Sequence, residues 1–98
     1  LVAPPTVERA LRSLDVVADA LVVGLPNERW GQIVAALIVP SALGRAQASS
    51  MSAEALSAAL SDALAPWEKV RRVLVVDALP TTTTGKPDPV AAARLFDA

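Results

Sequence analysis

The sequence contains only two lysines, Lys69 and Lys86, and they lie in different surroundings. Lys69 is next to Glu68 and close to arginines, a pattern typical of a solvated charge cluster. Lys86 stands alone in a loop rich in proline and threonine, between Gly85 and Pro87. Gly85 would let the backbone approach a ligand closely, and Pro87 would stiffen the exit of the loop. Lys86 is therefore the first candidate for chemistry.

The pair Gly85-Lys86 invites comparison with the Walker phosphate loop, G-x-x-x-x-G-K-[ST]. In this sequence the first glycine position is Pro80, and the Ser/Thr position that would bind Mg²⁺ is Pro87. The segment also does not precede its helix in the required way. A P-loop is therefore excluded.

The composition removes several classes of reaction. There is no His, Cys or Tyr, which excludes the usual zinc site, a cysteine nucleophile, a hydroxyl activated by imidazole, and disulfides. Nine Lys and Arg against ten Asp and Glu give a formal net charge of -1, and without a basic run we expect no nucleic-acid partner. A chain of 98 residues is also too short to enclose both a nucleotide and an organic substrate. Lack of cysteine suits the cytoplasm, where we place the protein.

The first half of the sequence predicts a helix followed by a β-hairpin. Thr6 is expected to cap a helix over 7–14, whose apolar residues fall on one face. Residues 20–25 and 33–39 have the β-branched, apolar character of buried strands. The polar segment 26–31 between them predicts the connecting loop of a hairpin.

The second half begins with a connection, residues 40–50, whose small polar residues predict an exposed and mobile segment. Ser52 opens the clearest helix, with leucines at every fourth position, and Pro66 stops it. Residues 71–77 predict a third strand. Because this strand is reached by a crossover through the helix, it is free to lie parallel to a neighbour.

A loop over 81–87 then leads to a last short helix, with Asp88 as its N-cap and Pro89 at its first position. The order α-β-β-α-β-loop-α predicts an α+β fold, a small three-stranded mixed sheet covered by helices. Neither a repeat nor a domain boundary interrupts the sequence, so residues 1–98 form one domain.

Two features point beyond the chain itself. The apolar run 33–39 is about a third of the roughly 20 residues that a membrane span requires, so we expect no membrane span. Residues 1–5 have neither an initiator Met nor the features of a signal peptide, so we expect a piece of a longer protein. Hydrophobic residues make up 53% of the sequence and the mean hydropathy is +0.44. A domain of this size buries only about 60–65% of its unfolded-chain area. We therefore expect an apolar face, near the Lys86 loop or the hairpin, that contacts a partner.

Four segments together resemble one known family. Residues 76–86, a strand followed by Leu-Pro, four small or polar residues and Gly-Lys, resemble the last motif of the adenylate-forming acyl-CoA synthetase superfamily, which includes peptide-synthetase adenylation domains and firefly luciferase. Residues 5–11 are similar to its P-x-E-V-E-x-x-L helix, 25–32 to its P-D-x-x-W-G-E/Q hairpin, and 64–67 to its L-A-x-Y/W helix end. The chain is identified on this resemblance as the small C-terminal domain of such an enzyme.

The resemblance implies a role for Lys86 as the catalytic lysine that enters the active site during adenylation, in a substrate and nucleotide loop that includes Thr84 and Gly85. When a substrate carboxylate attacks the α-phosphorus of ATP and pyrophosphate leaves, an ammonium group stabilises the charge that gathers on the oxygens. The small domain then reorients for thioester formation with CoA. ATP and Mg²⁺ would be held mainly by the absent N-terminal domain, the main partner, so the isolated chain is predicted to be inactive.

The sequence leaves several residue roles open. Trp30 and Gly31 could shape a CoA-facing surface, or the tryptophan could pack over the glycine and close the hairpin. Segment 81–84 is either a small polar spacer or a ligand contact. After Lys86 the chain departs from the family pattern, with Pro-Asp-Pro at 87–89 in place of an apolar residue and Asp/Arg-Arg. Nothing in the sequence selects one arginine as a contact for CoA phosphates among Arg29, Arg45, Arg71 and Arg72.

The resemblance also allows more than one parent protein. A ligase of fatty-acid metabolism or another acid:CoA ligase is favoured over a peptide-synthetase module, with o-succinylbenzoyl-CoA synthetase as one option. The alternative from a different class is a non-catalytic protein-interaction domain of the same fold. A phosphate loop rich in Thr, Ser and Gly upstream of the chain would favour the ligase, and the acid substrate cannot be inferred.

Overall fold

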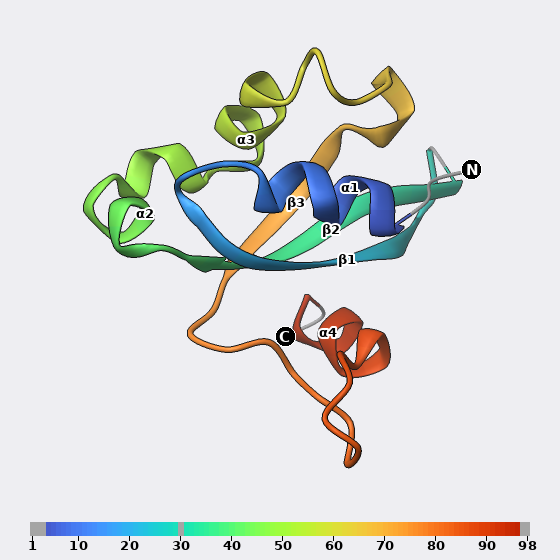
Figure 1. Ribbon diagram of the computed structural model, residues 1–98. Helices are drawn as coiled ribbons and strands as arrows, with labels where there is room; N and C mark the ends of the chain where they lie inside the picture. The colour runs from blue at the N-terminus through green and yellow to red at the C-terminus, as the bar shows by residue number, and fades with distance from the viewer. Residues whose placement is uncertain (1–3, 30, 97–98) are drawn as a thin grey trace.

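The computed structural model describes residues 4–29 and 31–96 and places a three-stranded sheet between helices (Figure 1). The elements are α1 Pro4–Arg12, β1 Val17–Asn27, β2 Gly31–Pro40, α2 Ala42–Ala46, a 3₁₀ turn Ala48–Met51, α3 Ala53–Ala59, a 3₁₀ turn Pro66–Glu68, β3 Val70–Val75 and α4 Pro89–Leu95. The α+β class and the predicted order of the main elements are confirmed.

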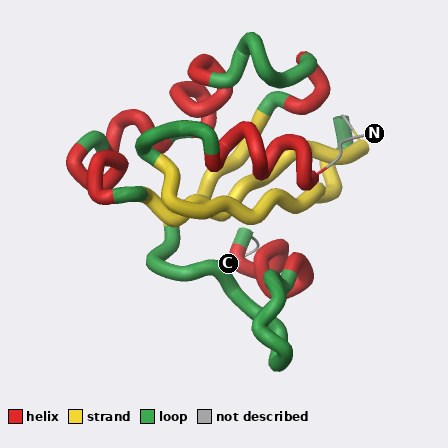
Figure 2. The backbone as a smooth tube through the Cα atoms, in the orientation of Figure 1, coloured by secondary structure: helices red, strands yellow, loops and turns green. Residues whose placement is uncertain are grey.

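The sheet is mixed, with strand order β1-β2-β3. β1 and β2 form an antiparallel hairpin, and β3 lies parallel to β2, as the crossover allows. Figures 1 and 2 show α1 and α3 over one face of the sheet and α4 under the other. The long loop from β3 to α4 extends below the body of the domain in the same view.

Two apolar clusters hold the layers together, one on each face of the sheet. The first packs α1 and α3 on the sheet and contains Val7, Leu11, Val17, Ala20, Val22, Val34, Ala36, Ile38, Met51, Leu56, Leu60 and Val70. The second packs α4 on the opposite face and contains Leu21, Val23, Leu25, Ala35, Leu37, Ala92 and Phe96. Alternate residues of β2 belong to different clusters because side chains alternate between the faces of a strand. The central strand is therefore buried on both faces.

The elements of the first half have other boundaries than the sequence predicts, since α1 ends at Arg12, β1 begins at Val17 and β2 spans 31–40. α1 begins at Pro4, so Thr6 lies inside the helix and is not its N-cap. Proline is tolerated in a first helical turn because its missing N–H would have no partner there. β1 continues to Asn27 and includes Pro26, which was expected in the loop. Proline is accommodated in β1 because β1 is an edge strand.

The predicted mobile connection over 40–50 is instead folded into α2 and a 3₁₀ turn. Ser41 caps α2 by accepting a hydrogen bond from the Gly44 N–H, at 3.1 Å. Its hydroxyl also donates to the Asp15 carbonyl at 2.6 Å, and its N–H donates to the Val16 carbonyl at 3.0 Å. These bonds tie the segment to the turn between α1 and β1.

The second half follows the prediction with shorter elements. Ser52 caps α3, as expected, but the helix ends at Ala59. Leu60 and Leu64 lie in the turn that follows and still contact the first cluster, so the apolar period continues past the end of the helix. β3 spans 70–75, where the sequence predicted 71–77.

Side chains of α1 occupy the outer edge of β1. The Glu8 carboxylate accepts a hydrogen bond from the Val22 N–H at 2.9 Å, and the Arg12 guanidinium donates to the Ala20 carbonyl at 3.0 Å. Arg12 also pairs with Asp19 at 2.9 Å. α1 is thereby joined to the sheet by polar bonds as well as by its buried face.

Candidate functional site

The loop that carries Lys86 is closed at its base. The Asp88 N–H donates to the Pro80 carbonyl at 3.0 Å, and an isolated β-bridge joins Thr81 to Pro87. On the entry side, Leu79 packs against the second apolar cluster. The loop therefore leaves the domain and returns to it as a narrow hairpin.

Hydrogen bonds also brace the tip. The Thr82 N–H donates to the Lys86 carbonyl at 2.7 Å, and the Gly85 N–H donates to the Thr82 carbonyl at 2.9 Å. The hydroxyls of Thr82 and Thr84 are 3.0 Å apart and share a hydrogen bond. Gly85 has φ +82°, the left-handed region that glycine adopts without strain. The sequence explained Gly85 by the approach of a ligand, whereas in this structure the turn itself requires it.

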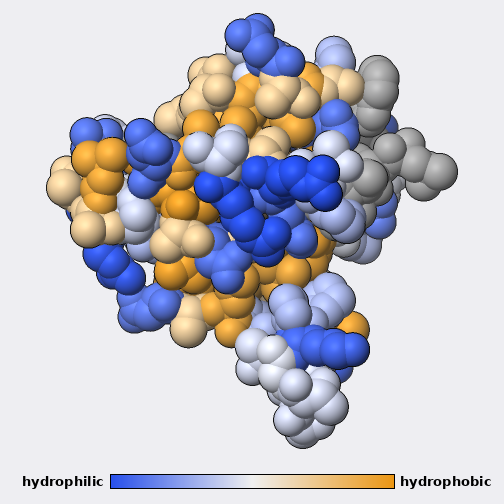
Figure 3. Space-filling view, in the orientation of Figure 1, coloured by the Kyte–Doolittle hydropathy of each residue, from blue (hydrophilic) through white to orange (hydrophobic). Residues whose placement is uncertain are grey.

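Lys86 is exposed, as are all residues of the loop from 81 to 87. Within residues 4–29 and 31–96, no ion pair engages its ammonium group. Figure 3 shows the protruding loop region as a pale to blue lobe below the more apolar body. An ammonium on a braced protrusion can stabilise anionic oxygens that another part of a protein surrounds.

The other residues predicted for the site are divided between two places. Thr84 and Gly85 lie beside Lys86 in the same hairpin, but Gly31 begins β2 at the turn of the β1–β2 hairpin, with φ +78°. The two hairpins lie apart in Figure 1. Trp30 lies outside the described residues, so its two interpretations stay predictions.

Arg72 and Arg45 have contacts that bear on their candidacy for CoA phosphates. Arg72 donates to the Phe96 carbonyl at 3.0 Å, and its guanidinium carbon lies 5.2 Å from the centre of the Phe96 ring. Arg45 lies 3.6 Å from the Asp77 carboxylate at the exposed surface. The contact between Arg72 and α4 could not be predicted from local patterns, because the two partners are 24 residues apart in the chain.

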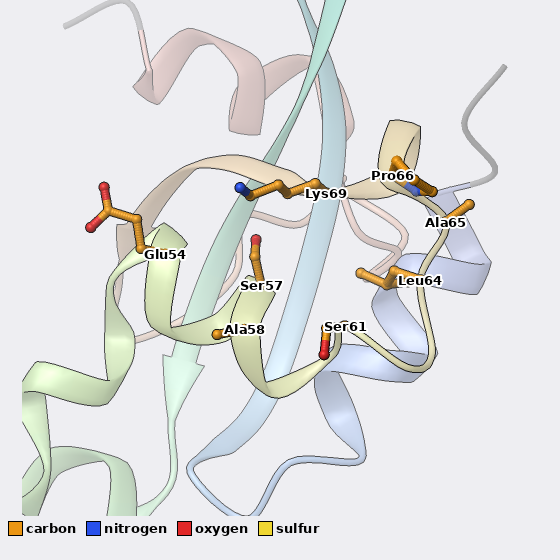
Figure 4. Close-up of a pocket in the computed structure, with 8 residues that line it drawn as sticks. All are labelled: Glu54, Ser57, Ala58, Ser61, Leu64, Ala65, Pro66 and Lys69. Atoms are coloured by element: carbon orange, nitrogen blue, oxygen red, sulfur yellow. The ribbon is translucent and has the colours of Figure 1, made fainter.

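A surface pocket of about 390 Å³ lies between α3 and the start of β3, on the face opposite α4. Figure 4 shows Ser57 and Lys69 among its lining residues. The Ser57 hydroxyl donates to the Val70 carbonyl at 2.9 Å, so it serves the packing of α3 on β3. This pocket is separate from the Lys86 loop.

A second, apolar groove of about 450 Å³ lies between β1 and α4, directly after the Lys86 loop in the chain. Val90 at its rim is 62% exposed. The lining residues of the groove are Val22, Val23, Gly24, Pro89, Val90, Ala93 and Arg94. The expected apolar face that contacts a partner stays a prediction.

The part of the chain that the structure describes has neither a metal-binding cluster nor a membrane-spanning helix. No three His, Cys, Asp or Glu side chains gather there into a possible metal site. None of the helices there is long and apolar enough to cross a membrane.

Comparison with known proteins gives consistent results. The chain is 35% identical over 85 residues to 4-coumarate–CoA ligase-like 6 of Arabidopsis thaliana, which covers 87% of the chain and 14% of that protein. It is 37% identical over 96 residues to the medium/long-chain-fatty-acid–CoA ligase FadD8 of Mycobacterium tuberculosis, covering 95% of the chain and 17% of that protein. The chain thus spans about a sixth of these curated relatives.

Among solved structures, the amide bond synthetase from Marinactinospora thermotolerans superposes with a TM-score of 0.85 and 33% identity, over 97% of the chain and 18% of that protein. The family described as the AMP-binding enzyme C-terminal domain matches residues 6–86. The chain belongs to this family of C-terminal domains of AMP-binding enzymes, in which acyl-CoA ligases are its relatives.

Proposed function

We propose that residues 1–98 are the C-terminal lid domain of an ATP-dependent acid:CoA ligase and that Lys86 is its adenylation lysine. The single observation that carries the proposal is the exposed ammonium group on a braced hairpin, at the end of the segment that matches the family. ATP, Mg²⁺ and the acid would be held mainly by a preceding large domain, with CoA as co-substrate.

In the proposed first reaction, a carboxylate oxygen attacks the α-phosphorus of ATP. A new P–O bond forms, the bond to the bridging oxygen breaks, and pyrophosphate leaves. Lys86 would stabilise the negative charge on the phosphate oxygens, and its role requires no proton transfer. In the second reaction the CoA sulfur attacks the acyl carbon and AMP leaves, after the domain has reoriented.

The geometry of the hairpin supports a site in which this domain supplies Lys86 and a second domain holds the substrates. Because the loop is exposed and protrudes from the domain, its lysine is suited to a site that another domain completes. The apolar groove between β1 and α4 is a surface that such a domain could cover. The isolated chain is accordingly expected to form no acyl-AMP.

The test uses the full-length protein that carries this domain, assayed with octanoate and 4-coumarate, acids chosen from the names of the relatives. Lys86→Ala should lower ATP–pyrophosphate exchange by about 10²–10³-fold, the usual loss when a transition-state charge partner is removed. The matched control is Lys69→Ala, which removes the other exposed lysine and should leave exchange unchanged. Undiminished exchange in Lys86→Ala would show that the lysine assignment is wrong.

The acyl acceptor defines the second candidate function. The similarity to an amide bond synthetase makes an amine the second candidate acyl acceptor, in place of CoA. Supplying preformed acyl-AMP with either CoA or an amine distinguishes them, since a ligase should release AMP only with CoA. A carrier domain downstream would instead indicate a peptide-synthetase parent. Adding o-succinylbenzoate to the substrate panel tests the option of an o-succinylbenzoyl-CoA synthetase.

The remaining alternative is a non-catalytic interaction domain. It predicts that neither lysine variant changes any reaction of the parent and that the parent has no upstream phosphate loop. Cytoplasmic location and a role in fatty-acid metabolism stay predictions.

A further inference from the structure

Asp88 joins the Lys86 loop to α4 through four hydrogen bonds. Its N–H donates to the Pro80 carbonyl at 3.0 Å, across the base of the loop. Its carboxylate accepts hydrogen bonds from the N–H groups of Val90 and Ala91, both at 3.1 Å. Its carbonyl accepts from the Ala92 N–H at 3.0 Å, within the first turn of the helix.

α4 itself is fixed to the sheet. Ala92 and Phe96 are buried in the second apolar cluster. Arg72 on β3 donates to the Phe96 carbonyl and lies over its ring, so the far end of α4 is held by a contact with the sheet. Asp88 is therefore the junction between an anchored helix and an exposed loop.

No apolar packing holds the tip of the loop, because residues 81–87 are all exposed. The direction in which the hairpin leaves the domain thus depends on its base, where Leu79 packs against the second apolar cluster and the Asp88 N–H donates to the Pro80 carbonyl. The match to the family covers 6–86 and ends at Lys86. Asp88 lies just beyond it, in the segment Pro-Asp-Pro.

We propose that Asp88 is a positioning residue for Lys86, whose carboxylate fixes the first turn of α4 and so the path of the loop that carries the lysine. This inference rests on the proposed function of Lys86. Small displacements of a catalytic group are costly in rate, which is why a residue that only fixes the loop would affect the reaction.

The variants separate the hydrogen-bond acceptor from the charge. Asp88→Ala removes the acceptor, whereas Asp88→Asn keeps an oxygen in the same place, and Asn is as good an N-cap as Asp. Asp88→Gly also lacks the acceptor, but glycine is better tolerated than alanine at a helix N-cap, so it serves if the alanine variant does not fold. Asp62→Ala is the matched control, since Asp62 is an exposed carboxylate in the turn after α3.

The experiment measures the two half-reactions separately in the full-length protein, with the acid that the wild type adenylates. Asp88→Ala should lower ATP–pyrophosphate exchange about tenfold, the rate equivalent of a lost N-cap. Asp88→Gly should lower exchange by a smaller factor, because glycine is itself a tolerated N-cap residue. Thioester formation from supplied acyl-AMP and CoA should stay within about twofold, because Lys86 is not used there. Asp88→Asn should restore exchange, and Asp62→Ala should leave both half-reactions unchanged.

Three results would overturn the inference: unchanged exchange in both Asp88→Ala and Asp88→Gly, an equal fall in both half-reactions, or no restoration by Asp88→Asn. Lys86→Ala is measured in parallel. If Lys86→Ala keeps full exchange, the proposed function itself fails. If Lys86→Ala loses exchange while the Asp88 variants keep it, only the positioning role of Asp88 fails.

Discussion

Gly44 offers a test in which the structure and helix propensity predict opposite signs. Gly44 lies inside α2, and replacing a helical glycine by alanine ordinarily stabilises a helix by about 1 kcal/mol. In this domain a Cβ on Gly44 would lie 2.1 Å from the Val16 carbonyl oxygen, a backbone atom. Contacts under 3.0 Å are essentially never seen for a Cβ, so α2 would have to move by about 0.9 Å.

A shift of that size would break the 3.0 Å bond from the Ser41 N–H to the Val16 carbonyl. A lost hydrogen bond costs about 1 kcal/mol, and forcing an extra methyl into a packed site costs about 1–3 kcal/mol. After the gain in helix propensity, Gly44→Ala should lower the free energy of unfolding by about 1–3 kcal/mol. In urea the midpoint should fall by about 1 M, given the slope typical of small domains.

The matched control is Gly24→Ala. The three heavy atoms nearest to a Cβ at Gly24 all belong to the end of the Gln32 side chain, the first at 2.6 Å, and that exposed side chain can move aside. Gly24→Ala should therefore unfold within about 0.5 kcal/mol of the wild type. The reasoning would be refuted if Gly44→Ala unfolded at or above the wild-type urea concentration, or if both variants lost the same stability.

Two further predictions concern single contacts. Ser57→Ala should lower the free energy of unfolding by about 1–3 kcal/mol, because it leaves the Val70 carbonyl without its 2.9 Å partner. The exposed control Ser61→Ala should lower it by less than about 0.5 kcal/mol in the same denaturation assay. Equal losses would contradict the role of the Ser57 bond. At Gly85 the positive φ and the open space around a Cβ predict that Gly85→Asn is tolerated better than Gly85→Val. Amide exchange at the Thr82 N–H checks this, and equal protection in the two variants would count against a strained turn.

The sequence was informative where an element carries its own local signal. The apolar alternation and β-branched residues of 20–25 and 33–39 predicted the two strands of the hairpin. Asp88 followed by Pro89 predicted the start of α4, which the structure has with two capping bonds. The crossover argument left β3 free to lie parallel to a neighbour, and in the structure that neighbour is β2.

The errors arose where tertiary contacts decide the outcome. Segment 40–50 has no apolar period. Its order comes from hydrogen bonds of Ser41 to the turn around Asp15, which lies 26 residues earlier in the chain. The helix after Ser52 was expected to continue to its last leucine, but Leu64 reaches the core from a turn. No pattern of single residues shows either feature.

For the site, the sequence selected Lys86 and its neighbours Thr84 and Gly85 but not the way in which they are held. The bond across the base of the loop, from Asp88 to Pro80, joins backbone atoms and leaves no signature in residue types. The role of Arg72 at the end of α4 was likewise hidden, because it appears only when β3 and α4 are placed together.

The contacts of α1 with β1 have a consequence for the behaviour of the domain in solution. A free strand edge is a template on which another chain can add a strand, and this is a common beginning of aggregation. Glu8 and Arg12 occupy hydrogen-bonding groups of Val22 and Ala20 that an incoming strand would need. Replacing Glu8 and Arg12 would free these backbone groups of β1 and leave the apolar packing of the fold in place. The two side chains of α1 therefore protect a hydrophobic domain against pairing with a second chain.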